Sequence, residues 1–167
     1  MTPTPSILTL DLAKAVGWAC LKGDQSLTSG HRSFAPLPGQ KVGALFYKWA
    51  AWLDIRTKTH GIKFVAYELV DFRMQNRHWV QMYHGMTAIL MAKCEAHGIE
   101  YRGYTVADIK HAATGKKKAS KPDMIRAARA QWPDQHVIDD NQADALWVLW
   151  LAMKDCGIDL KHEEELF

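Results

Sequence analysis

Apolar residues recur along this chain with two different periods, and the order of those periods limits the fold more than any other feature. Short continuous or alternating runs predict strands over residues 6–12, 17–21, 26–33, 62–69 and 99–104. Spacings of three and four residues predict helices over residues 42–59, 76–97, 106–113, 121–131 and 141–154. Three strands in succession, then helix–strand–helix–strand, then helices, predict an α/β protein whose sheet is covered by helices.

The bulk composition is that of one globular domain. With 167 residues, 48% of them apolar and 23% charged, the chain can bury a full core. We expect one domain over residues 1–167, ending in an acidic tail from about residue 158. No apolar run approaches the roughly 18 residues of a membrane span, and the N-terminus is no signal peptide. Widely spaced cysteines (Cys20, Cys94, Cys156) form neither a disulfide framework nor a zinc site, which predicts a cytoplasmic protein.

Three acidic residues stand at the ends of apolar segments, where a carboxylate is out of place. Asp11 comes at the end of SILTLDL and Glu68 at the end of IKFVAYEL, so each lies at the tip of a predicted strand. Asp144 lies in the last predicted helix, with a tryptophan and a valine on the same stripe. Ligands bind at the carboxyl edge of open α/β sheets. We therefore expect all three acids to meet there, with Asp140 or Asn141 beside them.

Each acid also has a simpler explanation. Asp11 can start an Asx turn, Glu68 can pair with a lysine, and Asp144 can be an acid near the start of its helix. Asp139 or Asp140 suits an N-cap. The placement of all three acids at the ends of apolar elements favours a shared site over three separate structural roles.

Such a cluster predicts a site for a hard divalent cation. Carboxylate and amide oxygens without histidine or cysteine suit Mg²⁺, with Mn²⁺ as a substitute, because these ions prefer oxygen ligands and bridge to phosphate. Two such ions can activate a water molecule and stabilise the departing oxygen of a phosphodiester. Without a cation, neighbouring carboxylates would raise one another's pKa.

Four segments resemble one known family. ILTLDLAKAVGWA, from residue 7, resembles the first motif of RuvC-type Holliday junction resolvases, and VAYE, from residue 65, resembles their second acidic motif. YTVADIKHAATGKKKASK, from residue 104, resembles the segment after their fifth strand. NQADALWVLWLA, from residue 141, resembles their terminal Asp-x-x-Asp-Ala-Leu helix. The order of the predicted elements also matches their ribonuclease-H-like fold.

The resemblance implies a homodimeric, Mg²⁺-dependent endonuclease that nicks four-way DNA junctions symmetrically. We accordingly expect a ribonuclease-H-like, five-stranded mixed sheet of three antiparallel and two parallel strands. The resemblance points to Asp11, Glu68 and Asp144 as metal ligands. It also places Lys110 and Lys121 near the scissile phosphate, where they would stabilise charge while water attacks.

Two departures from the family pattern modify these expectations. Many relatives have aspartate and some have histidine where this chain has Asn141, so either the Asn141 carbonyl or Asp140 would complete the ligand set. The lysine run at residues 116–118 and the compact length look more like phage or mobile-element members, in a bacterial or phage-infected cytosol. This implies a substrate range among branched DNAs that extends from four-way junctions to three-way junctions and flaps.

Basic and aromatic residues near the acids are candidate DNA contacts. Residues 110–129 carry seven lysines and arginines against one aspartate, although the net charge is only +3. Such a cluster binds phosphates in a salt-dependent way or forms a solvated loop. Phe72 either stacks on an unpaired base or belongs to the core. The predicted DNA contacts are Phe72, Arg73, Arg77, Lys110, Lys116, Lys117, Lys118 and Lys121.

The helix predicted over residues 76–97 carries a stripe of methionine, leucine and aromatic side chains. Such a stripe suits either a core or a protein interface. Symmetrical cutting of two strands favours pairing of this helix across a two-fold axis. The stripe consists of Trp79, Met82, Tyr83, Met86, Leu90 and Met91.

Two rival functions follow from the same residues. One is an RNA-processing nuclease of the same fold. The other is a junction-binding protein that has lost cleavage, which the neutral Asn141 permits. Cleavage that disappears when Asp11 or Asp144 is changed to asparagine distinguishes a nuclease from a binder.

Overall fold

The computed structural model describes residues 4–71 and 76–158, and its elements follow the predicted order. The strands are β1 (Ile7–Asp11), β2 (Ala15–Leu21), β3 (Leu27–Ser33), β4 (Phe64–Leu69) and β5 (Glu100–Thr105). The helices are α1 (Gly43–Thr59), α2 (Arg77–His97), α3 (Val106–Thr114), α4 (Lys121–Gln131) and α5 (Asp140–Asp155). None of these helices is long and apolar enough to cross a membrane. Residues 159–167 of the predicted acidic tail lie outside the described residues.

Most boundaries differ from the sequence-based expectation by one or two residues, and one element was not expected. β2 begins at Ala15 rather than at residue 17, because Ala15 and Val16 still pair with the end of β3. A short 3-10 helix, η2 (Pro133–Gln135), separates α4 from α5 and was not predicted.

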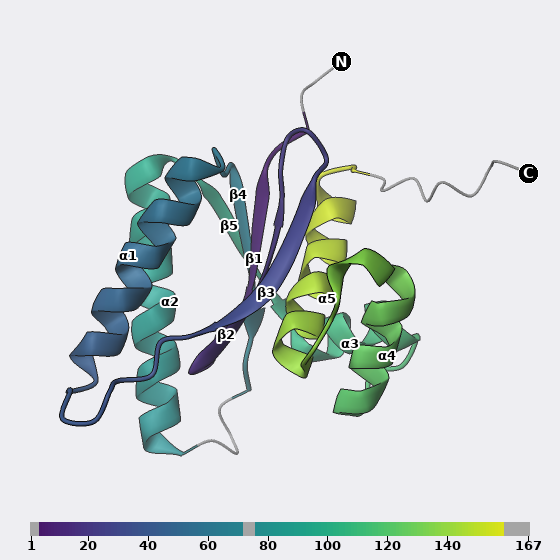
Figure 1. Ribbon diagram of the computed structural model, residues 1–167. Helices are drawn as coiled ribbons and strands as arrows, with labels where there is room; N and C mark the ends of the chain where they lie inside the picture. Colours follow the sequence, from purple (N-terminus) through teal and green to yellow (C-terminus); the bar gives the residue numbers. More distant parts are fainter. Residues whose placement is uncertain (1–3, 72–75, 159–167) are drawn as a thin grey trace, which may run out of the picture.

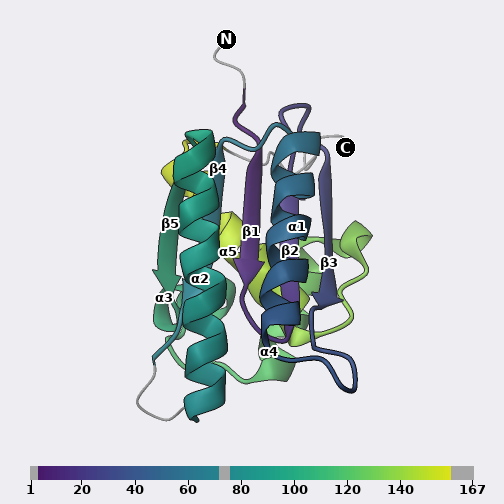
Figure 2. The same ribbon diagram turned by 90° about the vertical axis from the view of Figure 1, so that its left-hand side faces the viewer.

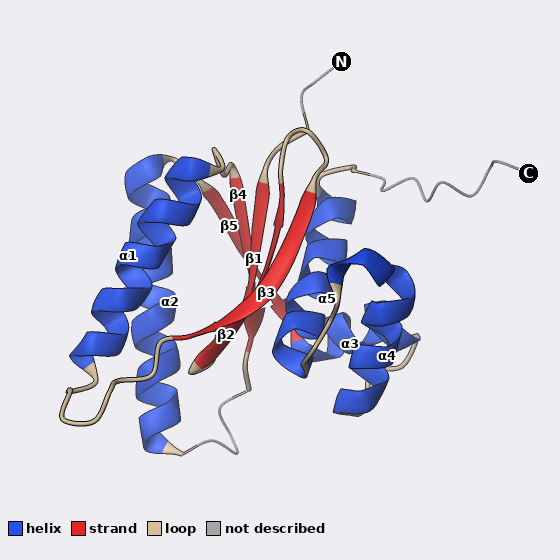
Figure 3. Ribbon diagram, in the orientation of Figure 1, coloured by secondary structure: helices blue, strands red, loops and turns tan. Residues whose placement is uncertain are grey.

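The five strands form one mixed sheet in the order β3-β2-β1-β4-β5 (Figure 3). β2 is antiparallel to both β1 and β3, whereas β4 is parallel to both β1 and β5. This is the predicted combination of three antiparallel and two parallel strands, so the predicted fold class is confirmed.

Helices cover both faces of the sheet. α1 and α2 lie on one face, and α3, α4 and α5 lie on the other (Figure 1). α1 and α2 run side by side across their face (Figure 2). Leu8 and Trp49 belong to the core under α1 and α2, and Ile7 and Leu146 belong to the core under α5. The sheet therefore separates two hydrophobic cores.

The alternation of side chains along a strand decides which face each acid occupies. In β1, Ile7 belongs to the core under α5 and Leu8 to the opposite core, so Asp11 faces α5. In β4, Ala66 belongs to the core under α5, so Glu68 faces the same way. Both acids thus lie on the α5 side of the sheet, at the carboxyl ends of two neighbouring parallel strands.

α5 lies very close to the sheet at Gly17, the register partner of Asp11 in the β1–β2 ladder. A Cβ atom on Gly17 would lie 1.8 Å from the backbone carbonyl oxygen of Asn141, so only glycine leaves room for the first turn of α5. One turn further along, the Thr9 hydroxyl donates a buried hydrogen bond of 2.7 Å to the Ala145 carbonyl. These contacts hold the start of α5 beside Asp11.

The apolar stripe of α2 faces this chain's own core. Trp79 and Met91 pack partly buried against the core under α1 and α2, and the buried members are Met82, Tyr83, Met86 and Leu90. The core interpretation of the stripe is therefore confirmed. Pairing through α2 would have to use its exposed face, which carries Gln81, His84, Ala88 and Ala92.

We predict that Gly17→Ala destabilises the protein by about 2–4 kcal/mol, because the added methyl group meets backbone atoms that cannot move aside cheaply. Urea denaturation measures the change. Gly43→Ala is the matched control, since a Cβ there meets nothing within 4 Å. Equal stability of the two variants would show that α5 does not depend on the close approach at Gly17.

Candidate active site

Three carboxylates from separate elements gather at the carboxyl edge of β1 and β4. Asp11 ends β1, Glu68 is the penultimate residue of β4, and Asp144 lies in the second turn of α5. Asp11 is 8% exposed, and Glu68 and Asp144 are partly buried. Glu68 and Asp144 both lie close enough to Asp11 to raise its pKa. Three acids that are 57 and 76 residues apart along the chain (68 − 11 and 144 − 68) therefore share one site.

Burial and mutual repulsion disfavour the charged form of all three acids. Burial holds the pKa of Asp11 well above its usual value, and the negative charges of Glu68 and Asp144 raise it further. Burial also raises the pKa of Glu68 to about 7, with Asp144 as the second cause. The pKa of Asp144 rises to about 7, again first through burial and then through Asp140. Lys110 opposes the shift in both Glu68 and Asp144 without cancelling it. The nearby lysines therefore do not offset the effect of burial on these carboxylates.

Two side-chain contacts, one of them an ion pair, hold the N-terminus of α5. Asp139 is the N-cap, as one of the two sequence alternatives predicts: one of its oxygens accepts a hydrogen bond of 2.8 Å from the Gln142 N–H. Its other oxygen lies 2.7 Å from Nδ1 of His31 in β3. Asp140 pairs with Lys121, the first residue of α4, at an N–O distance of 2.5 Å. This hydrogen bond raises the pKa of Lys121. Of the two residues considered for a further ligand, Asp140 therefore already has a cationic partner.

The chemistry of the donor set fits a hard cation, although the side chains do not form a closed ligand group. Across residues 4–71 and 76–158, no three His, Cys, Asp or Glu side chains converge closely enough to hold a metal ion as they stand. The three acids nonetheless offer only oxygen donors, and their charge is buried without full compensation. Oxygen donors of high charge density are the ligands of Mg²⁺ and Mn²⁺.

Lys110 and Lys121 lie near the acids, and the other described basic residues of the prediction are exposed on α2 and in the loop after α3. Lys110 belongs to α3, and the Lys121 side chain at the start of α4 is 79% exposed. Gly115 ends α3 in a left-handed conformation, and the exposed lysines 116–118 follow in the loop to α4. Arg77 is exposed at the first turn of α2. Phe72 and Arg73, the remaining predicted DNA contacts, lie outside the described residues.

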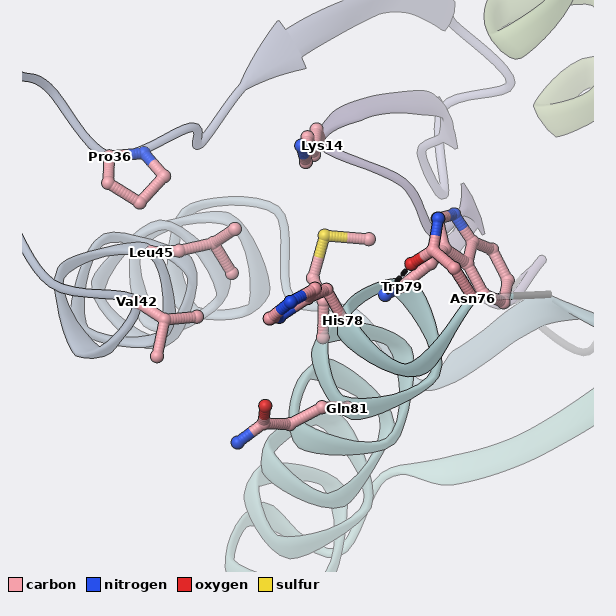
Figure 4. A pocket seen from close by; sticks show the side chains of 9 residues that line it. Lys14, Pro36, Val42, Leu45, Asn76, His78, Trp79 and Gln81 are labelled. Carbon is pink, nitrogen blue, oxygen red and sulfur yellow. Dashed lines mark hydrogen bonds between the residues drawn. The ribbon is translucent and has the colours of Figure 1, made fainter.

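Figure 4 shows a pocket that sequence reasoning missed. The pocket has a volume of about 720 Å³ and lies between the N-terminal parts of α1 and α2 and the turn that follows β1. Leu45 and Trp79 provide apolar walls, and Lys14 lies at its edge, three residues after Asp11. Because it adjoins the carboxyl end of β1, the pocket lies at the same end of the sheet as the acids. No sequence spacing links α1 to α2 in this way, so only the fold could reveal it.

We predict a specific pH dependence for the metal-free protein. Glu68 and Asp144 have pKa values of about 7 in the fold but near 4 when unfolded, so the fold binds more protons between these values. Their contribution to stability is complete below about pH 4 and is lost as the pH rises through about 7. The free energy of unfolding of Asp144→Asn should therefore rise relative to that of the wild type as the pH rises, by on the order of 2 kcal/mol at pH 8 in EDTA.

Thermal denaturation at pH 4, 6 and 8 measures this gain. Asp134→Asn, a change at an exposed acid in η2, is the control and should show no comparable trend. A constant difference in stability between Asp144→Asn and the wild type across this range would contradict the raised pKa of Asp144.

Comparison with known proteins finds similar structures, but no match by sequence. No known family matches the sequence, and no characterised relative does. RuvC from Thermus thermophilus superposes with a TM-score of 0.72 at 16% identity, over 91% of this chain and 96% of RuvC. The same protein in complex with a Holliday junction substrate gives a TM-score of 0.73 at 16% identity, over 91% and 97%. The yeast mitochondrial Holliday junction resolvase Ydc2 gives 0.60 at 12% identity, over 93% and 84%. The chain therefore has the ribonuclease-H-like fold of RuvC.

Proposed function

We propose that this chain is a metal-dependent endonuclease that cuts Holliday junctions and other branched DNA by paired nicks. The observation that carries the proposal is the gathering of Asp11, Glu68 and Asp144 in one partly buried site with raised pKa values. Carboxylates that are costly to leave unpaired are retained where they have a chemical task. The fold shared with RuvC, which has been solved with a Holliday junction substrate, supports DNA cleavage as that task by analogy of fold, while the site chemistry carries the argument.

Asp11, Glu68 and Asp144 would hold Mg²⁺, with Mn²⁺ as a substitute and the Asn141 carbonyl as a further ligand. Asp140 fits this role less well, because it pairs with Lys121. When bound, the metal supplies positive charge at the scissile phosphate and lowers the pKa of the attacking water. The carboxylates orient that water, and their burial keeps bulk solvent away from the site.

Lys110 and Lys121 would stabilise the negative charge that develops on the phosphate. Lys110 already lies close to Glu68 and Asp144, since it lowers the pKa of both. Lys121 is tied to Asp140, so binding of a phosphate would require Lys121 to exchange a carboxylate for a phosphate oxygen. The exposed position of the Lys121 side chain makes that exchange accessible.

The surface around the acids would hold the branch point. Lysines 116–118 and Arg77 are exposed on either side of the site and would bind phosphates without reading bases. The pocket beside Trp79 offers apolar walls to a base that has left its stack. Paired nicks require a second active site, so we propose that the protein acts as a homodimer.

A junction-binding protein without cleavage is the second candidate. Two observations favour it: the neutral Asn141 in place of an acid, and the lack of a closed group of three metal-binding side chains among the described residues. A cleavage assay separates the two candidates.

We expect paired nicks in a mobile four-way junction when the purified protein is incubated with Mg²⁺ or Mn²⁺, and at least a hundredfold slower cutting by Asp144→Asn. The change removes a charged oxygen ligand, and loss of such a ligand costs orders of magnitude in rate. The same proteins should be tested on a three-way junction, a flap, linear duplex and an RNA–DNA hybrid. Cutting of the hybrid alone would favour an RNA-processing nuclease. Tight junction binding with no cutting of any substrate would identify the junction binder.

Replacing the three lysines 116–118 with glutamine should weaken junction binding and flatten its salt dependence by about 0.9 in log–log slope for each phosphate that is no longer bound. Electrophoretic mobility shift at several salt concentrations measures the slope in EDTA. The matched control replaces Lys58, Lys63 and Lys154, exposed lysines at the opposite end of the sheet. If both triple variants have the same slope, the loop binds no phosphates of its own.

A further inference from the structure

A basic groove runs along α1 on the side that faces β3, away from the acids. It has a volume of about 510 Å³ and is lined by Arg32 of β3, by one side of α1 from Tyr47 to Thr59, and by His60 directly after the helix. From Lys48 to Thr59 the groove follows α1 for roughly 17 Å. α1 covers the sheet face opposite α3, α4 and α5, so this groove is distinct from the lysine loop of the proposed active site (Figure 2).

The charge of the groove is positive and not neutralised. Arg32, Lys48 and Arg56 line it, and no carboxylate among residues 4–71 and 76–158 lies within ion-pair distance of any of them. No acidic side chain is part of the lining. His60 at the upper end has a lowered pKa, first through burial and then through Lys22 and Arg56, so positive charge is crowded there.

Aromatic and apolar side chains alternate with these cations. Tyr47 is 78% exposed and Ile55 is 63% exposed, both unusually high values for residues of their type. The guanidinium of Arg56 lies 4.2 Å from the ring centroid of Trp18 and 5.2 Å from that of Trp52, so its position is fixed by stacking. The indole N–H of Trp52, which lines the groove, is buried and has no hydrogen-bond acceptor within the described part of the chain.

We infer that this groove binds single-stranded DNA, with the backbone on Arg32, Lys48 and Arg56 and a base stacked on Tyr47. Cations without carboxylate partners beside an exposed aromatic ring are the combination that binds single strands without reading their sequence. Lys48 would exchange its hydrogen bonds to the Ala35 carbonyl and to Gln40 for a phosphate oxygen. An acidic protein segment would match the cations but would not need the exposed tyrosine. The inference extends the proposed function: the strand would be an unpaired arm of a branched substrate, held on the sheet face away from the acids.

Fluorescence anisotropy with a labelled 15-residue oligo-dT in EDTA tests the inference on the full chain. Tyr47→Ala should weaken binding about tenfold through loss of stacking. Arg32→Gln/Lys48→Gln should weaken it by a similar factor and flatten the log–log salt slope by about 1.4, or 0.7 for each of two phosphates. The control Lys63→Gln/Lys154→Gln removes the same charge from exposed positions outside the groove and should bind like the wild type.

The outcomes separate this inference from the proposed function. Selective loss of oligo-dT binding in the groove variants supports the groove even if no junction is ever cut. Junction cleavage together with equal oligo-dT binding in all variants overturns the groove alone. Equal weakening by the control double variant, no effect of Tyr47→Ala, or no binding by the wild type overturns it as well. Loss of binding only in the variant of lysines 116–118 would move the site to that loop.

Discussion

The contact between the first turn of α5 and β2 determines whether the acids meet. Gly17 lies opposite Asp11 in the ladder and directly beneath the backbone of Asn141. A side chain at this position would lift α5 and carry Asp144 away from Asp11. The Thr9 hydroxyl adds a hydrogen bond from the middle of β1 to the next turn of the helix. Gly17 therefore has a steric role: because it has no side chain, the first turn of α5 can lie close to the sheet.

The acid cluster lowers the stability of the metal-free protein, and burial of apolar side chains in the two cores has to compensate for this loss. Burial raises the pKa of Asp11, Glu68 and Asp144, so the metal-free protein at neutral pH is less stable than one with neutral groups at these positions. The helix that carries Asp144 is also the most deeply buried helix, since its apolar side chains fill the core under the sheet. The buried α5 therefore holds Asp144 in place without a ligand, while β1 and β4 hold the other two acids.

Much of the fold could be predicted because the local signals agree with one another. Strand and helix periods, and the position of Asp11 and Glu68 at strand tips, required no tertiary information, and alternation along a strand then fixes the face on which each acid lies. Contacts between distant elements were not accessible in the same way. The pairing of His31 with Asp139 and of Lys121 with Asp140 depends on how β3 and α4 lie against α5. For the stripe on α2, the sequence allowed both a core and an interface, and only the packing of α1 against α2 decides for the core.

The partition of the sheet into two cores lets the two faces of the protein change independently. Along β1, residues 7, 9 and 11 face α5, whereas residues 8 and 10 pack in the core under α1 and α2. A substitution on the second set is insulated from the acids by the thickness of the backbone layer. A change at Leu8 or Leu10 therefore alters the core under α1 and α2, whereas a change at Thr9 alters the side of the strand that carries the site.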